Sequence, residues 1–170
     1  MHMSITQDRF RPLRPVGQTT LRVTDLCVGC APLGDMPDTF AYSVPEDRAL
    51  ETVRATFDGA INFIDTAASY GDGESERRIG MVIRERGGVP NGIVLATKAD
   101  RDLHTGDFSG DQMKRSVERS LRLLGVDRLQ LVHLHDAEHT TFENIMSQRG
   151  PLEVLRGLKD EGVIEVLGVA

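Results

Sequence analysis

The sequence lacks the features of several large protein classes. No apolar run approaches the ~20 residues that a membrane-spanning helix needs. The first residues, Met1 to Arg14, contain no apolar segment of the kind found in signal peptides, so we expect no secretory leader. The cytoplasm is therefore the default location, and no membrane partner is predicted.

Basic residues are also fewer than acidic residues. The 170-residue chain has 20 basic and 26 acidic residues, which give a net charge of −6. The basic residues are scattered and form no basic face, so nucleic acid is not an expected partner. An apolar content of 39% and this length suffice for one domain with a substantial core.

Cysteine occurs only at Cys27 and Cys30, in a C-x-x-C spacing. Both lie in a short apolar run that predicts a strand, where residues three apart face opposite ways and lie roughly 10 Å apart. A disulfide tolerates a Cα separation of only about 7 Å. A zinc site would need a second ligand pair, and none has the required spacing. We therefore expect two small, buried side chains and no metal site.

Short apolar runs alternate with helical patterns along most of the chain. Apolar–polar alternation around Gly17 predicts a hairpin over residues 10–23. Strands are predicted at residues 26–30, 62–67, 93–98, 129–135 and 163–170. Helices are predicted at residues 46–58, at 75–86, from Ser109 or Asp111 to Leu124, and from about Leu152 to Gly162.

This alternation predicts a parallel sheet covered by helices. A doubly wound open sheet and a (β/α)₈ barrel both satisfy it. The run Gly71-Asp72-Gly73 is a weak dinucleotide fingerprint, because Glu76 stands in place of the third glycine and the run follows the second strand. Reactive residues at the ends of three strands favour a TIM-type barrel, of which the sequence supplies about five strands and four helices after the hairpin.

Four residues form the candidate catalytic set: Asp65, Tyr70, Lys98 and His135. Asp65 on its own could merely cap a turn, but a lysine at the next strand end predicts an ion pair. A lysine ammonium beside Tyr70 would favour the phenolate and make the phenol a usable acid or base. His133 and His135 point the same way in a strand, and we choose His135 because it lies nearer the carboxyl end.

Such a set suits proton transfer at a carbonyl or alcohol oxygen. No side chain supplies hydride, so an oxidation or reduction would need a nicotinamide. The sequence contains no nucleophile elbow and no metal cluster, so hydrolysis finds no support.

Several motifs together resemble the N-terminal part of the aldo/keto reductase family. They are residues 29–34 (GCAPLG), 62–71 (NFIDTAASYG), 74–80 (ESERRIG), 95–98 (LATK), 116–121 (SVERSL), 124–127 (LGVD), 134–136 (LHD) and 155–170. They are most similar to the bacterial aldose dehydrogenase and pyridoxal 4-dehydrogenase branch.

The resemblance implies a role for each candidate residue. Tyr70 is the general acid/base, Lys98 makes it more acidic, Asp65 pairs with the lysine and His135 orients the substrate carbonyl. It also implies bound NADP or NAD, with NADP slightly favoured. The cofactor contacts would come from Gly29, Cys30, Ala31 and Asp65, and the substrate would be an aldehyde, ketone or aldose.

The sequence covers only part of the family pattern. The family's barrel has eight strands, and residues 1–170 supply five, so we expect a single incomplete barrel domain. Open outer strands predict self-association and weak cofactor binding. The alternative is a truncated or non-catalytic aldo/keto reductase-like module that binds or regulates a partner.

Overall fold

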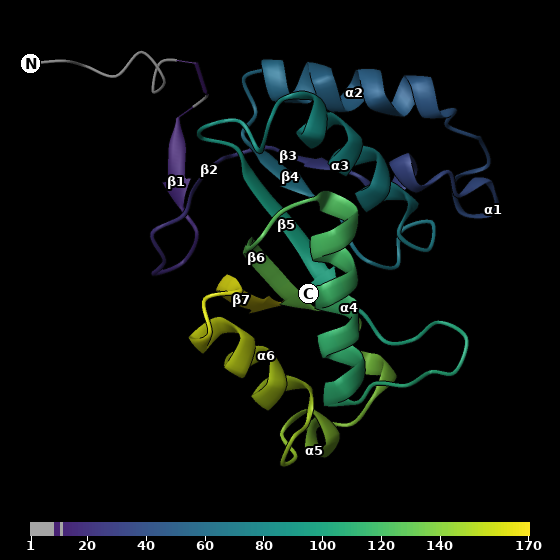
Figure 1. Cartoon of the computed structure of the whole chain (residues 1–170), viewed down its shortest axis with the longest axis vertical. Helices are drawn as coiled ribbons and strands as arrows, with labels where there is room; N and C mark the ends of the chain where they lie inside the picture. The colour runs from purple at the N-terminus through teal and green to yellow at the C-terminus, as the bar shows by residue number, and fades with distance from the viewer. Residues whose placement is uncertain (1–8, 11) are drawn as a thin grey trace, which may run out of the picture.

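A computed structural model describes residues 9, 10 and 12–170, which form two sheets and a set of helices (Figure 1). A two-stranded antiparallel hairpin comes first, with strands β1 (Leu13–Pro15) and β2 (Arg22–Thr24). The parallel sheet contains β3 (Cys27–Gly29), β4 (Phe63–Asp65), β5 (Val94–Ala99), β6 (Leu129–Leu134) and β7 (Ile164–Val169).

Four helices connect these strands. They are α2 (Glu46–Asp58), α3 (Glu74–Glu85), α4 (Gly110–Leu124) and α6 (Pro151–Asp160). Shorter pieces lie in the loops: the 3₁₀ turns η1 (Ala31–Gly34) and η2 (Ala137–His139), and the single-turn helices α1 (Pro37–Phe40) and α5 (Phe142–Ile145). None of the helices in the described part of the chain is long and apolar enough to cross a membrane.

The strand order of the parallel sheet is β3-β4-β5-β6-β7, the same as the order along the chain. A doubly wound sheet reverses its order at a switch point, whereas a barrel adds each strand beside the last. The structure therefore confirms the α/β architecture and the five predicted strands, and its order is that of a barrel. Among the described residues, β3 and β7 are the outer strands of this sheet.

The sheet has an apolar cluster on each face. On one face, side chains such as Ile64, Leu95 and Leu134 pack against helices α2, α3, α4 and α6, which follow one another along the sheet (Figure 1). On the other face, the hairpin residue Leu21 packs with Ala96 and its neighbours on β5, β6 and β7. The predicted hairpin thus covers part of the face opposite the helices.

Local chemistry explains where the helices begin and end. Ser109 caps α4, because its side chain accepts a hydrogen bond from the Gln112 N–H. Gly125 ends the same helix in the left-handed conformation at φ +70°. Of the two caps the sequence allowed, Ser109 is the one used.

Cys27 corrects one prediction. Cys30 is buried as expected, but Cys27 is exposed, because it lies on an outer strand that has a neighbour on one side only. Both thiols are free. Burial raises the pKa of Cys30 to about 12, and partial desolvation of its thiol together with the nearby Asp65 carboxylate raises that of the exposed Cys27 to about 11, so neither thiol is a ready nucleophile.

Candidate active site

The register of the sheet places the candidate residues on one face. Asp65 on β4 lies beside Ala96 on β5, and Lys98 on β5 lies beside His133 on β6. Partners in a parallel ladder share a face, and residues two apart along a strand do as well. Asp65 and Lys98 therefore project from the face opposite the helices, at the carboxyl ends of their strands.

Lys98 is the centre of the predicted set. Its Nζ donates to Oδ2 of Asp65 at 2.6 Å, to the Thr66 carbonyl at 2.9 Å and to the Tyr70 hydroxyl at 3.2 Å. The side chain is buried, with the residue only 6% exposed. The structure thus brings the lysine, the aspartate and the tyrosine into direct contact.

Two opposing effects act on the Lys98 ammonium. Burial alone would lower its pKa, since desolvation disfavours charge. The hydrogen bond and ion pair with Asp65, together with the Tyr70 contact, outweigh burial and raise the pKa above the ordinary lysine value. The ammonium is therefore held in its charged form beside the phenol.

A tight backbone contact fixes the position of Tyr70. Gly71 adopts φ +60°, and a Cβ there would lie 2.0 Å from the carbonyl oxygen of Gly34 in η1. Only glycine fits this close approach. The Tyr70 carbonyl also accepts a hydrogen bond from the Ser75 N–H at the start of α3. The loop after β4 is thereby clamped between η1 and α3.

His135, rather than His133, approaches the tyrosine. The rings of Tyr70 and His135 lie edge to face, with centroids 6.1 Å apart. His133 packs against Gly168, where a Cβ would come within 2.7 Å of the ring. Burial lowers the pKa of His133, and its Nδ1 has no partner among the described residues. Of the two histidines, His135 is the one whose ring lies next to Tyr70.

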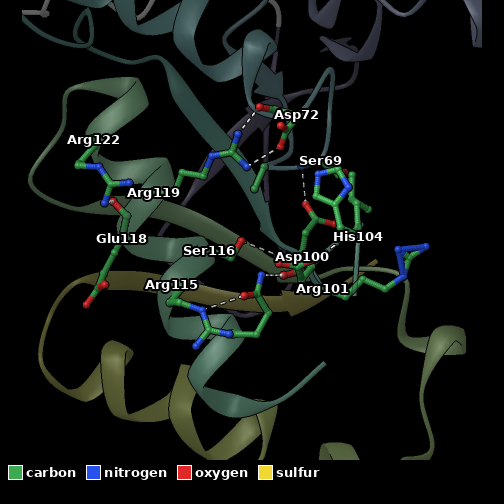
Figure 2. A pocket seen from close by; sticks show the side chains of 14 residues that line it. Ser69, Asp72, Asp100, Arg101, His104, Arg115, Ser116, Glu118, Arg119 and Arg122 are labelled. Carbon is green, nitrogen blue, oxygen red and sulfur yellow. Dashed lines mark hydrogen bonds and ion pairs between the residues drawn. The ribbon is translucent and has the colours of Figure 1, made fainter. Parts of the chain in front are cut away.

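Asp100 belongs to the same cluster, and our sequence analysis did not single it out. Its Oδ1 lies 2.5 Å from Nδ1 of His135. Its Oδ2 accepts the Ser69 N–H at 2.9 Å (Figure 2). Strand β5 ends at Ala99 and Asp100 lies just beyond it, so the alternation of side chains along the strand does not predict where Asp100 points.

The residues expected to contact a cofactor lie around the end of β3. Gly29 lies beside Asp65 in the sheet and is exposed, and no atom lies within 4 Å of where its Cβ would be. This open backbone next to Asp65 leaves room for a flat ring to lie against it. Ala31 opens η1 and is half-buried.

Cys30 has fewer free groups than Gly29 with which to contact a ligand. Its N–H donates to the Asp65 carbonyl, its own carbonyl accepts from the Ser75 hydroxyl, and its side chain is buried in the core. These contacts tie β3, β4 and α3 together beneath the open backbone of Gly29.

A polar cleft of about 470 Å³ adjoins the cluster (Figure 2). Its lining includes Ser69 and Asp100, other residues of the loop after β4 (Ala68 and Asp72), helix α4 and the loop after β5. None of Asp65, Tyr70, Lys98 and His135 lines it. Arg119 of α4 pairs with Asp72 across the cleft at 2.8 Å. Its walls carry both signs of charge.

Chemically, the cluster can move one proton. A phenol beside a charged ammonium can release or regain its proton at a nearby oxygen. A histidine at the edge of that phenol can hold the oxygen in place. The described residues of the cluster include no activated serine or cysteine nucleophile.

Comparison with known proteins agrees with this geometry. A sequence model described as the aldo/keto reductase family matches residues 25–170. The chain belongs to the aldo/keto reductase family. The match covers most of the chain and includes every residue of the cluster.

Three curated relatives are dehydrogenases of small molecules. L-galactose dehydrogenase of Arabidopsis thaliana is 34% identical over 92% of this chain and 47% of its own length. D-threo-aldose 1-dehydrogenase of a Pseudomonas species is 27% identical, over 88% and 50%. Pyridoxal 4-dehydrogenase of Microbacterium luteolum is 27% identical, over 99% and 56%. The chain thus spans about half the length of the curated relatives it matches.

Solved aldo-keto reductases share the fold. The holo form of an enzyme from Bacillus halodurans aligns with a TM-score of 0.75 at 29% identity, over 93% of this chain and 49% of its own. An enzyme from Klebsiella pneumoniae in complex with NADPH aligns with a TM-score of 0.66 at 26% identity, over 87% and 45%. The TIM-type barrel expected from the sequence is confirmed as the fold to which these five strands belong.

Proposed function

We propose that the whole protein is an NAD(P)-dependent oxidoreductase that interconverts an alcohol and a carbonyl compound. One observation carries the proposal. A buried lysine amine contacts both the Tyr70 hydroxyl, at 3.2 Å, and the Asp65 carboxylate, at 2.6 Å. Membership of the aldo/keto reductase family supports the same reaction class.

In this proposal Tyr70 is the general acid/base. During alcohol oxidation its oxygen takes the hydroxyl proton, and during carbonyl reduction it returns a proton to the carbonyl oxygen. Lys98 stabilises the phenolate that appears in between, and Asp65 keeps the lysine charged and oriented. His135 holds the reacting oxygen next to the phenol. A bound nicotinamide supplies or accepts the hydride.

The cofactor is proposed to lie against the open backbone at Gly29, with Ala31 and Asp65 at its edge and Cys30 supporting that backbone from within. The empty space above Gly29 and the carboxylate beside it support this placement. NADP is slightly favoured over NAD, because the aligned Klebsiella enzyme is in complex with NADPH. No metal is required by this chemistry.

The proposed substrate is a hydroxylated small molecule, with an aldose as the leading candidate. Two of the relatives are named as dehydrogenases of aldoses, L-galactose and D-threo-aldose. The predicted location remains the cytoplasm.

An absorbance assay of nicotinamide reduction tests the proposed function. The whole protein is mixed with NADP⁺ or NAD⁺ and a panel of aldoses, simple alcohols and pyridoxal-type alcohols. We expect reduced nicotinamide to appear with at least one aldose and not with cofactor alone. Absence of turnover across the panel in both directions, in protein that binds NADPH, would contradict the proposal and favour a non-catalytic module.

We also propose that residues 1–170 form one incomplete barrel domain and that these residues, taken alone, associate with a second copy. The outer strands β3 and β7 each have one neighbour, so their remaining backbone groups are available for pairing. Val169 at the end of β7 is 68% exposed. A second copy of this chain would pair strand to strand with these free backbone groups and would cover the exposed Val169 side chain.

A further inference from the structure

Arg78 on α3 is the only buried arginine in the described part of the chain, with 6% of the residue exposed. Its Nη1 donates to the carbonyl oxygens of Leu33 and Val44, at 2.9 Å each. Its Nε donates to Oε1 of Glu74 at 2.7 Å. A guanidinium group stays charged in proteins and only donates hydrogen bonds, so a buried one needs acceptors around it. Two of the three acceptors of Arg78 belong to the backbone of the loop after β3.

These two carbonyl groups lie at the two ends of one loop segment. Leu33 belongs to η1, Val44 lies two residues before the first residue of α2, and residues 34–43 lie between them. Because both carbonyls accept from the same nitrogen, the segment is closed at its neck. The Asp35 carboxylate closes the neck a second time by accepting the Val44 N–H at 2.9 Å. Arg78 thus joins both ends of the segment to α3.

The residue after Leu33 is Gly34, which rests on the backbone of the Tyr70 loop. A Cβ at Gly34 would lie 2.7 Å from the Gly71 nitrogen and 2.7 Å from the Tyr70 carbonyl carbon. No side chain fits into that contact, so the position of η1 limits where the backbone of Tyr70 can lie. Because Arg78 holds the Leu33 carbonyl, it also holds the turn that presses on Tyr70.

We propose that Arg78 is a positioning residue: its guanidinium holds η1 against the Tyr70 loop and so keeps the Tyr70 hydroxyl beside the Lys98 amine. The inference rests on the proposed function, because the contact matters to catalysis only if Tyr70 transfers the proton. It adds to that function that the acid/base depends on a buried arginine of α3, outside the cluster of reacting groups.

An arginine suits this position better than a lysine or an apolar side chain. The planar guanidinium presents its N–H groups in fixed directions, and a lysine, with one flexible nitrogen, cannot reproduce that fork. A methionine fills similar space but leaves the buried carbonyls of Leu33 and Val44 without a donor. Hydrogen bonds from Arg77 and Arg78 outweigh partial burial and lower the pKa of Glu74, so the opposite charge stays in place beside the guanidinium.

Fluorine NMR of the whole protein labelled with 3-fluorotyrosine tests the structural step without any turnover. Residues 1–170 contain two tyrosines, Tyr42 and Tyr70, and Tyr70→Phe identifies the Tyr70 signal. We expect Arg78→Met to move that signal toward its position in the urea-unfolded protein, and Arg78→Lys to move it less. Arg77→Met, at the next residue of α3, is the matched control and should leave the signal in place. Arg77 binds the same Glu74 carboxylate but, among the described residues, neither loop carbonyl.

Kinetics of the whole protein test the catalytic step. At saturating cofactor and substrate, Arg78→Met should lower kcat about 10–100-fold and Arg78→Lys about three- to tenfold, because a small displacement of a catalytic group is costly. In a Tyr70→Phe background the same substitutions should change kcat less than about twofold, because the group that Arg78 positions is already gone. A merely structural role would instead lower kcat equally in both backgrounds.

Three results would overturn the inference: a Tyr70 signal that stays in place in the Arg78 variants, an equal shift in Arg77→Met, or equal losses of kcat in the two backgrounds. Arg78→Lys retains the charge and decides these questions even if Arg78→Met does not fold.

The two proposals fail in distinguishable ways. Absence of nicotinamide-dependent turnover contradicts the proposed function, although the fluorine spectra would still report whether Arg78 holds Tyr70. Turnover that depends on Tyr70 but not on Arg78 contradicts only the role of Arg78.

Discussion

At the scale of single residues, Glu76 on α3 is a buried carboxyl group with an unusual environment. It is fully buried, the Thr97 hydroxyl donates to its Oε1 at 2.6 Å, and its Oε2 has no partner among the described residues. Burial raises the pKa of Glu76 to about 7, although the hydrogen bond from Thr97 opposes the shift. The native state therefore binds a proton there that the unfolded chain gives up at lower pH.

This shift predicts a pH dependence of stability. A raised carboxyl pKa stabilises the native state fully below its unfolded value of 4.5, and that contribution is lost as pH rises through about 7. Glu76→Gln mimics the protonated acid and retains the acceptor for Thr97. Between pH 5 and pH 8 we expect the wild type to lose about 2–3 kcal/mol of unfolding free energy relative to Glu76→Gln.

Urea unfolding of both proteins at the two pH values measures this difference. The control is Glu51→Gln, on the exposed face of α2, which should follow the wild type at both pH values. If the unfolding free energies of the wild type and Glu76→Gln changed equally with pH, the raised pKa of Glu76 would be refuted.

Sequence reasoning went furthest for residues whose role follows from strand position. Asp65, Lys98 and His135 were singled out because each stands at or near the end of an apolar run, and the register brings the strand ends at Asp65 and Lys98 together. Their catalytic roles remain predictions. Asp100 escaped because its partner, His135, lies 35 residues away and no local pattern links them. Cys27 was misjudged because burial depends on the strands on either side, which the local run does not specify.

At the scale of elements, the helix pair α3–α4 depends on one small residue. A Cβ added at Gly80 of α3 would lie 2.0 Å from the Leu123 carbonyl oxygen of α4. Any side chain there must push the two helices apart. Because α3 follows the Tyr70 loop and α4 follows the loop that contains Asp100, this pair also sets the spacing of the site.

Gly80→Ala should destabilise the chain by about 1–3 kcal/mol through overpacking. Gly157→Ala in α6 is the matched control, since no atom lies within 4 Å of its Cβ position and alanine is the better helix former. That control should gain roughly 0.5–1 kcal/mol. Denaturant midpoints of the two variants measure both effects, and similar changes in both would contradict the packing argument.

Elements with long periodic patterns were predicted well. Helix α2 has its predicted bounds, and the other three long helices differ at their ends by one or two residues. The single-turn helices α1 and α5 were missed, because four residues carry no measurable period. They lie in loops whose shape follows from tertiary contacts, such as the Asp35 carboxylate that accepts the Val44 N–H.

At the scale of the whole molecule, the sheet has two open edges in the described structure. Strand β7 pairs with β6 on one side only, and its exposed Val169 lies at the end of that strand. Unprotected edges of this kind recruit other strands. We expect residues 1–170, taken alone, to self-associate as their concentration rises, which sedimentation velocity measures.

A lysine at the edge should weaken that association, because a charge there cannot be paired by an incoming strand. Val169→Lys should raise the apparent dissociation constant about tenfold or more. Leu103→Lys, at a similarly exposed loop position, is the control and should leave it unchanged. A wild-type chain that sediments as a monomer at all concentrations would contradict the proposed edge pairing.

The sequence pattern sufficed for the parallel α/β architecture, because alternation and strand composition are local properties. It did not distinguish a barrel from an open sheet by periodicity alone. That choice came from three reactive residues at strand ends, and the strand order β3 to β7 supports it.

The central claim is that the Tyr70 hydroxyl, held 3.2 Å from the Lys98 amine, transfers the proton. The chain has only one other tyrosine, Tyr42, which is 53% exposed and lies outside the cluster, so Tyr42→Phe is a matched control. The most direct test compares kcat and NADPH affinity of the whole protein with those of Tyr70→Phe and Tyr42→Phe. We expect Tyr70→Phe to lose about 10²–10⁴-fold in kcat with cofactor affinity nearly intact, and Tyr42→Phe to match the wild type. A Tyr70→Phe protein that retains more than about a tenth of kcat would contradict the acid/base role on which the account depends.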